Sequence, residues 1–167
     1  MLKTVLARDV MSRPVRQLTT WTPVRDAAAF LLRHGISGAP VIDEHGRWIG
    51  VFTQNDIARY VQERITRGNS ERTLEAREKV SGSSPLRLDL FGETRVEELM
   101  TLGMYTVFPD ATLEEVVHAL TAFKIHRVFV IQETGTALLG VITTMDVLRC
   151  LDVDRDQKKN GRRLARA

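Results

Sequence analysis

The stretch GVFTQNDIA at residues 50–58 decides the fold, because it recurs as GVITTMDVL at residues 140–148. Both copies have the form Gly-Val-x-Thr-x-x-Asp, and each stands before an apolar run. Thr followed three residues later by Asp is typical of a helix start, because the Thr caps the helix and the acid bonds back to it. The repeat therefore predicts the same strand-to-helix turn twice in one chain.

The repetition covers most of the chain, which is the sign of a tandem architecture. Residues 9–57 align with residues 98–147, with one extra residue in the second copy before Leu138. Each copy predicts a short extended segment, a helix, two strands joined by a hairpin, and a last helix. The extended segments are expected at 15–18 and 105–108, the hairpins turn at Gly46 and Gly135, and the last helices begin at Thr53 and Thr143. We therefore expect a mixed α/β (α+β) fold of two tandem β-α-β-β-α repeats packed with pseudo-two-fold symmetry.

Capping residues mark the ends of the first long helix in each copy. In the first copy, Thr22 is expected at the N-cap, with Pro23 at the first helical position and Gly35 as the C-terminal stop. In the second copy, Thr112 is expected at the N-cap and Glu115 completes a capping box.

The domain boundaries follow from the repeat. We assign residues 1–60 to the first repeat, 61–93 to a partly helical insert, 94–151 to the second repeat and 152–167 to a basic tail. Within the insert, a helix is expected to continue past Tyr60 and break at Gly68-Asn69-Ser70, before a second helical stretch at 71–80 and a loop at 81–85. Thr94 to Glu97 reads as a capping box that opens the second repeat.

Composition excludes several classes of protein. The chain has 167 residues, 43% of them hydrophobic and 27% charged, and no apolar run reaches the roughly 18 residues of a membrane span. The N-terminus lacks the apolar region of a signal peptide, so a cytoplasmic protein without membrane contact is expected. Cys150 is the only cysteine and reads as a core residue, and the four histidines are not spaced as metal ligands.

The net charge of +3 is concentrated in the tail. A solvated tail is the simplest interpretation, and contact with an anion or nucleic acid is the alternative. No aromatic side chains accompany the tail, which disfavours nucleic acid as a partner.

The Thr-x-x-Asp pair allows two interpretations. The structural one is a helix cap, in which the acid also favours the positive end of the helix dipole. The functional one uses the same geometry, because a helix N-terminus with a hydroxyl attracts phosphate and a carboxylate accepts hydrogen bonds from ribose hydroxyls.

The ordered motifs resemble the cystathionine β-synthase (CBS) domain pair, also called a Bateman module. DVM and ELM open the two copies, SGAPVID and HRVFVIQ lie in the middle, and GVFTQND and GVITTMD close them. The stretch FKIHRVFVI at residues 123–131 is also similar to a KIHR stretch in the γ subunits of the AMP-activated kinases.

The resemblance implies binding of AMP, ADP, ATP or S-adenosylmethionine in clefts between the two repeats, with no cofactor required. It implies that the Thr and Asp of each copy contact ribose or phosphate, that the residues before the middle strand line the base, and that His126 and Arg127 meet phosphates. The implied ligand-binding residues are Arg16, Ile36, Ser37, Gly38, Pro40, Thr53 and Asp56 in the first copy, and Tyr105, Ile125, His126, Arg127, Val128, Thr143 and Asp146 in the second. Phe129 departs from the pattern, since it stands where the first copy has Pro40. The cations of the second copy favour the Asp146 site for phosphorylated ligands.

The sequence therefore predicts a non-catalytic regulatory module that senses an adenine nucleotide and signals to an unidentified partner protein. No catalytic constellation and no metal site are expected. The alternatives are a ligand-independent dimerisation or scaffold module, and a nucleic-acid contact through the tail. A homodimer is expected, joined through apolar helix faces: Ala27, Ala28, Phe30 and Leu31 with Val116, Val117 and Leu120.

Overall fold

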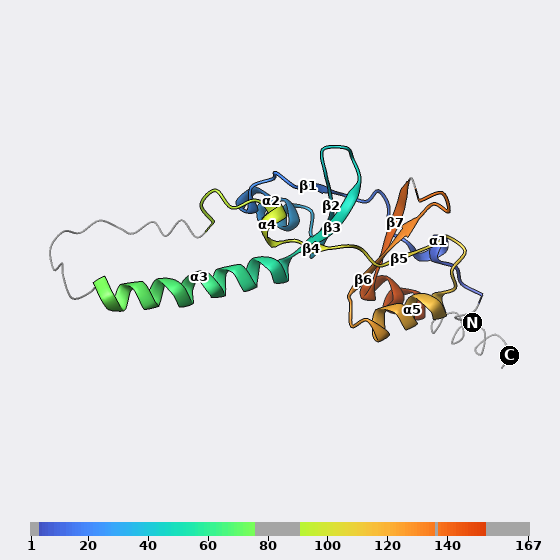
Figure 1. Cartoon of the computed structure of the whole chain (residues 1–167). Coiled ribbons are helices and arrows are strands. Elements are labelled where there is room, and N and C mark those ends of the chain that lie inside the picture. The colour runs from blue at the N-terminus through green and yellow to red at the C-terminus, as the bar shows by residue number, and fades with distance from the viewer. Residues whose placement is uncertain (1–3, 76–90, 136, 153–167) are drawn as a thin grey trace. The chain divides into compact units, whose positions relative to one another are not determined.

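The computed structural model describes residues 4–75, 91–135 and 137–152 and divides the chain into two compact units. The first-copy unit is Arg16–Gly103, and the second-copy unit combines Met1–Val15 with Met104–Ala167. The elements of both units are labelled in Figure 1. Each unit is described by itself.

The first-copy unit is built on a four-stranded sheet of order β1-β2-β3-β4. Strand β1 runs parallel to β2, while β3 is antiparallel to both of its neighbours. Figure 1 shows α3 extending past the sheet of this unit. The elements are β1 (Leu18–Thr19), α2 (Val24–Arg33), β2 (Gly38–Ile42), β3 (Trp48–Thr53), α3 (Gln54–Glu75), α4 (Val96–Leu99) and β4 (Thr101–Leu102).

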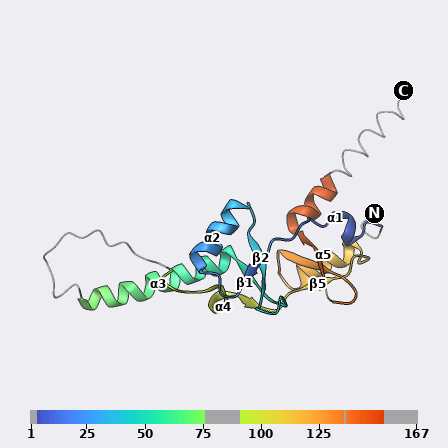
Figure 2. The same cartoon turned by 90° about the horizontal axis from the view of Figure 1, so that it is seen from above.

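The second-copy unit repeats this plan with a three-stranded sheet of order β5-β6-β7. Strand β5 is parallel to β6, and β6 is antiparallel to β7, in the same relation as β1, β2 and β3. A helix at residues 144–152 follows β7, and Figure 2 shows it continuing from the sheet. The other elements are α1 (Ala7–Val10), β5 (Thr106–Val107), α5 (Leu113–Ala122), β6 (Arg127–Ile131) and β7 (Leu138–Thr143). The predicted α+β repeat is confirmed.

Each unit has its own apolar core, which joins the long helix to one face of the sheet. Ala27 and Leu31 of α2 are fully buried in the first core, and Val116 and Leu120 of α5 are buried in the second. At about 25 cal/mol per Å² of apolar surface, such burial is the main stabilising term of a small unit. The prediction that these helix faces join two chains is therefore wrong for the four buried residues, since their own units already cover them.

The opening segment of each repeat packs in the unit of the other repeat. Ala7 of α1 is fully buried in the second-copy core, and Ser12 forms a bridge with Val141 of β7. Val96 of α4 is fully buried in the first-copy core, and β4 pairs with β3. Ser12, directly after DVM, and β4, directly after ELM, therefore pair with strands formed by residues far away in the sequence.

The Gly of the repeated motif permits this exchange. A Cβ atom at Gly50 would lie 2.5 Å from the carbonyl oxygen of Thr101 and 3.2 Å from the sulfur of Met100. A Cβ atom at Gly140 would lie 2.7 Å from Cγ of Met11 and still closer to its sulfur. Real Cβ atoms do not approach other atoms so closely, so both positions require a residue without a side chain.

The local chemistry of the helix ends was partly predicted. Thr112 and Glu115 form the expected capping box, in which the Thr112 N–H and hydroxyl donate to the Glu115 carboxylate and hold its pKa below the usual value. Gly35 ends α2 with a positive φ of 60°, as expected. Lys124 occupies the same place after α5 with φ of 53°, a conformation that most side chains avoid.

Two caps differ from the prediction by one residue. Pro23, not Thr22, is the N-cap of α2, because its carbonyl accepts the first helical bond from Ala27. The Thr22 hydroxyl instead bonds the hydroxyl of Thr19 at 2.7 Å.

The capping box before α4 is also shifted by one position. The Arg95 N–H donates to Glu98 at 2.8 Å, while the hydroxyl of Thr94 bonds that of Tyr60. The Thr94 hydroxyl therefore bonds a residue of α3, and Arg95 forms the capping box of α4.

The expected break at Gly68-Asn69-Ser70 is wrong, since α3 continues through it to Glu75. A glycine costs a helix interior only about 1 kcal/mol, which the surrounding helix-forming residues outweigh. The loop at 81–85, the second half of the helix expected at 71–80 and nearly all of the basic tail lie outside the described residues.

We expect Gly50→Ala to lower the free energy of unfolding by about 1–3 kcal/mol, because the new Cβ meets a backbone oxygen that only a chain shift can move. Gly140→Ala should cost a similar amount, since the new Cβ would also lie 2.8 Å from the Cβ of Met11, which no side-chain rotation can move. Urea unfolding followed by circular dichroism measures both. Equal and negligible effects would show that the crossing segments do not pack this closely.

Candidate functional site

The predicted site residues lie at one end of the strands in each sheet. Strands β1 and β2 begin at this edge and β3 ends there, with Gly38 paired to Thr53. In the second-copy unit, β5 and β6 begin and β7 ends at the equivalent edge, with Arg127 paired to Thr143. Each edge continues directly into a helix N-terminus. We call these the first-copy edge and the second-copy edge.

Most of the predicted residues of each copy lie at these edges. The first-copy edge carries Arg16, Ile36, Ser37, Gly38, Thr53 and Asp56, and the second-copy edge carries Tyr105, Ile125, His126, Arg127, Thr143 and Asp146. Pro40 and Val128 lie further along β2 and β6 and are fully buried, so their side chains have no exposed surface.

A backbone hydrogen bond ties the loop before the middle strand to the helix start. The Gln54 N–H donates to the carbonyl of Ser37 at 3.0 Å, and the Thr144 N–H donates to that of His126 at 3.2 Å. The two copies therefore hold the predicted base-lining loop and the Thr-x-x-Asp turn together by the same bond.

At the first-copy edge, Asp56 forms a buried cap. Its Oδ2 accepts from the N–H of Thr53 at 2.8 Å and from the Thr53 hydroxyl at 2.7 Å. Its Oδ1 accepts from the guanidinium of Arg59 at 3.0 Å. The carboxylate side chain is only 6% exposed, whereas that of Arg59 is 63% exposed.

The second-copy edge repeats the cap with one more partner. Oδ2 of Asp146 accepts from the Thr143 N–H at 2.8 Å and from its hydroxyl at 2.6 Å. Oδ1 accepts from the Ser12 hydroxyl at 3.3 Å and from Arg149 at 3.4 Å. Ser12 belongs to the exchanged segment, so this site contains residues that are 134 positions apart.

The hydrogen bonds already made by Asp56 and Asp146 determine which carboxylate oxygen could accept a hydrogen bond from a ligand. A carboxylate offers about four acceptor positions. Asp56 has three of them occupied and Asp146 has four. A ribose hydroxyl can therefore bond Asp146 only by replacing a long contact at Oδ1, and the exposed arginine is the partner that is easiest to displace.

Sequence reasoning missed Arg59, Arg149 and Ser12. The arginines had a visible signal, because Asp-x-x-Arg occurs in both copies and places the guanidinium one turn beyond the acid. Ser12 had none, since its contact depends on the exchange of segments.

The first-copy edge is also rich in cations. The pKa of His34 is lowered by desolvation and by the positive charges of Arg16 and Arg33. A lowered pKa leaves this imidazole uncharged at neutral pH, so the two arginines carry the positive charge there.

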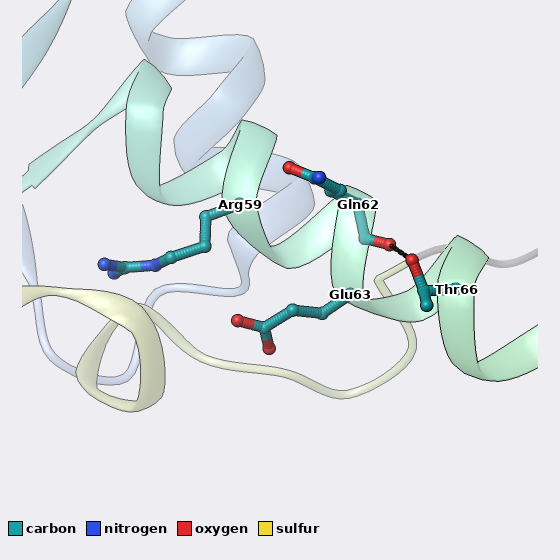
Figure 3. Close-up of a pocket in the computed structure, with 4 residues that line it drawn as sticks. All are labelled: Arg59, Gln62, Glu63 and Thr66. Atoms are coloured by element: carbon teal, nitrogen blue, oxygen red, sulfur yellow. Dashed lines mark hydrogen bonds between the residues drawn. The ribbon is translucent and has the colours of Figure 1, made fainter.

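A hollow of about 380 Å³ lies on α3 beside the Asp56 cap and is lined by Arg59, Gln62, Glu63 and Thr66. Figure 3 shows these side chains and the Thr66 hydroxyl, which donates to the Gln62 carbonyl at 2.9 Å. Arg59 is the only residue that this hollow shares with the cap. None of the predicted ligand-binding residues lines it.

Among residues 4–75, 91–135 and 137–152, no group of three or more His, Cys, Asp or Glu side chains is arranged to hold a metal ion. Within the same ranges, no helix has the length and apolar character to span a bilayer.

Comparison with known proteins identifies both repeats. The sequence profile of the CBS domain matches residues 7–63 and 96–153. The chain is 28% identical over 128 residues to the 5′-AMP-activated protein kinase subunit gamma of Saccharomyces cerevisiae. The matched stretch covers 77% of this chain and 34% of that protein. It is 23% identical over 144 residues to an L-aspartate semialdehyde sulfurtransferase of Methanocaldococcus jannaschii. That matched stretch covers 86% of this chain but 23% of the sulfurtransferase.

Solved structures share the fold. The CBS domain pair of protein MJ0100, in complex with 5′-methylthioadenosine and S-adenosyl-L-methionine, has a TM-score of 0.66 at 22% identity, over 90% of this chain and 98% of that one. CBSX2 in complex with AMP has a TM-score of 0.65 at 23% identity, with the same coverage. These likenesses confirm the predicted tandem repeat fold.

We expect Thr53→Val and Thr143→Val each to lower the free energy of unfolding by about 1 kcal/mol, because the hydroxyl that bonds the buried carboxylate at the helix start is lost. Thr106→Val, at an exposed position on β5, is the matched control and should be near neutral. Urea unfolding measures all three. Losses no larger than that of the control would contradict the capping role.

Proposed function

Because the chain belongs to the CBS domain family, we propose that it is a non-catalytic regulatory module that binds an adenosine-type ligand and signals to a partner protein. The observation that carries this proposal is the repeated edge, where a helix start, a hydroxyl and a buried carboxylate meet the loop before the middle strand. Structural relatives crystallised with AMP, S-adenosyl-L-methionine and 5′-methylthioadenosine support the ligand class.

The ribose is the part of the ligand that the Thr-x-x-Asp turn suits best. Asp56 and Asp146 would accept hydrogen bonds from the ribose hydroxyls at Oδ1, in place of Arg59 and Arg149. The released guanidinium would then be free to pair with a phosphate, for which its planar fork is well shaped. Thr53 and Thr143 would keep each carboxylate oriented from the other side.

The loop before the middle strand would hold the base. Ile36 and Ile125 are half-buried at the two edges, and each is followed by the residue whose carbonyl is bonded to the helix start. Arg16 and His126 are exposed beside them and would contact the phosphates.

Signalling requires that the ligand prefer one arrangement of the chain over another, because a ligand that binds both equally shifts nothing. Displacement of the two arginines is a ligand-dependent change of this kind, since it alters charges on the exposed surface of each helix. The relatives that carry enzyme names are much longer than this chain, and the stretches that they share with it are CBS domains.

Thermal melts of the nucleotide-free chain with AMP, ADP, ATP and S-adenosylmethionine test the proposal. A ligand at about 100 times its dissociation constant stabilises by about 2.7 kcal/mol, which raises Tm by roughly 5–10 °C for a chain of this size. We expect Asp146→Ala to reduce the ligand-induced shift, because the ribose loses its acceptor.

The comparison uses the ligand-induced shift, since Asp146→Ala also weakens a helix cap and lowers Tm by itself. Glu133→Ala, an exposed acid on the hairpin of the same unit, should leave the shift unchanged. If no adenosine ligand raises Tm, the capping boxes are structural only and a ligand-independent scaffold becomes the better account.

A further inference from the structure

Two exposed aromatic rings meet at the second-copy edge. The ring centroids of Tyr105 and Phe123 lie 4.6 Å apart, with an angle of 31° between the planes. Tyr105 is 47% exposed and Phe123 54% exposed, so about half of each residue faces solvent. Tyr105 precedes β5, and its carbonyl accepts a hydrogen bond from Phe129 of β6. Phe123 follows α5, two residues before Ile125.

The pair is confined to one of the two copies. In the repeat alignment, Tyr105 corresponds to Arg16 and Phe123 to His34. Arg16 is one of the charges that lower the pKa of His34, so these two side chains also lie near each other. The same two positions thus carry an aromatic pair at one edge and a cationic group beside an imidazole at the other.

We propose that Tyr105 and Phe123 form a stacking platform for the planar base of the ligand, so that the second-copy edge also binds adenosines without a phosphate. This inference rests on the proposed function and adds a difference between the two sites. The first-copy edge, where Arg16 and His34 stand in place of the platform and Arg33 adds a second positive charge, depends on a phosphorylated ligand.

Burial and chemistry support this assignment. Exposed aromatic rings are commonly used to stack planar bases, and stacking does not require a charge on the ligand. The platform adjoins Ile125 and the loop bonded to the helix start, where the base is placed by the proposed function. The expectation from the sequence that the second copy is the better phosphate site rests on His126 and Arg127 and stays a prediction.

Titration of the full-length chain with 2-aminopurine riboside, a fluorescent adenosine analogue without phosphate, tests the platform. We expect the fluorescence to be quenched on binding, because the base stacks on a ring. Phe123→Ala and Tyr105→Ala should weaken this binding by about 10-fold and remove the quenching. Tyr105→Phe should retain both.

Phe108→Ala is the matched control, since Phe108 is 50% exposed and follows β5 at the opposite end of the strand from Tyr105. It should bind the riboside as the unaltered chain does. Arg16→Ala should weaken AMP binding without changing riboside binding, and high salt should weaken only the phosphorylated ligand.

The outcomes separate the two proposals. If AMP raises Tm but the riboside does not bind, or if Phe123→Ala binds and quenches like the unaltered chain, the platform is wrong and the proposed function stands. If neither the riboside nor any adenosine ligand of the melting experiment binds, the proposed function itself is wrong.

Discussion

The close approach of a distant segment to one glycine in each copy is the constraint on which both units depend. Met11 lies against Gly140, and Met100 with Thr101 lies against Gly50. Only a position without a Cβ atom lets the opening segment of one repeat cross the last strand of the other. The crossing buries Ala7 and Val96 and brings Ser12 to the Asp146 carboxylate. The motif Gly-Val-x-Thr-x-x-Asp therefore joins a packing requirement to a helix cap.

Under the proposed function, the cap carboxylates connect stability with ligand binding. A buried carboxylate is costly unless its oxygens are hydrogen-bonded, and in both copies the Thr supplies two bonds to Oδ2. The remaining oxygen is bonded by an exposed arginine, at 3.0 Å in one copy and 3.4 Å in the other. Each guanidinium is largely exposed but its carboxylate is buried, so a ligand hydroxyl can replace the arginine only by supplying the hydrogen bond that the buried oxygen would lose.

Local chemistry was readable from the sequence, and contacts between distant segments were not. The hairpin glycines and the Thr112 box follow from residues within a few positions of one another, and the repeat follows from aligning the two halves of the chain. The exchange of DVM and ELM does not, because a short apolar segment carries no mark of the sheet that it will join. The continuation of α3 through Gly68 is a matter of balance, in which one unfavourable residue is outweighed by its neighbours. Phe123 was passed over because, in one dimension, it reads as the last apolar residue of an amphipathic helix.

Differences between two copies of one fold are more informative than either copy alone. The bonds from Gln54 to Ser37 and from Thr144 to His126 are the same, so the backbone of the edge is held in common. Side chains that do not support this backbone are free to differ, and Tyr105 and Phe123 differ from their counterparts in both charge and shape. If the two sites prefer different ligands, as we propose, the chain would respond to the ratio of those ligands rather than to the concentration of one. Under the proposed function, the shared cap would set where a ligand binds, and the residues around it would set which ligand is preferred.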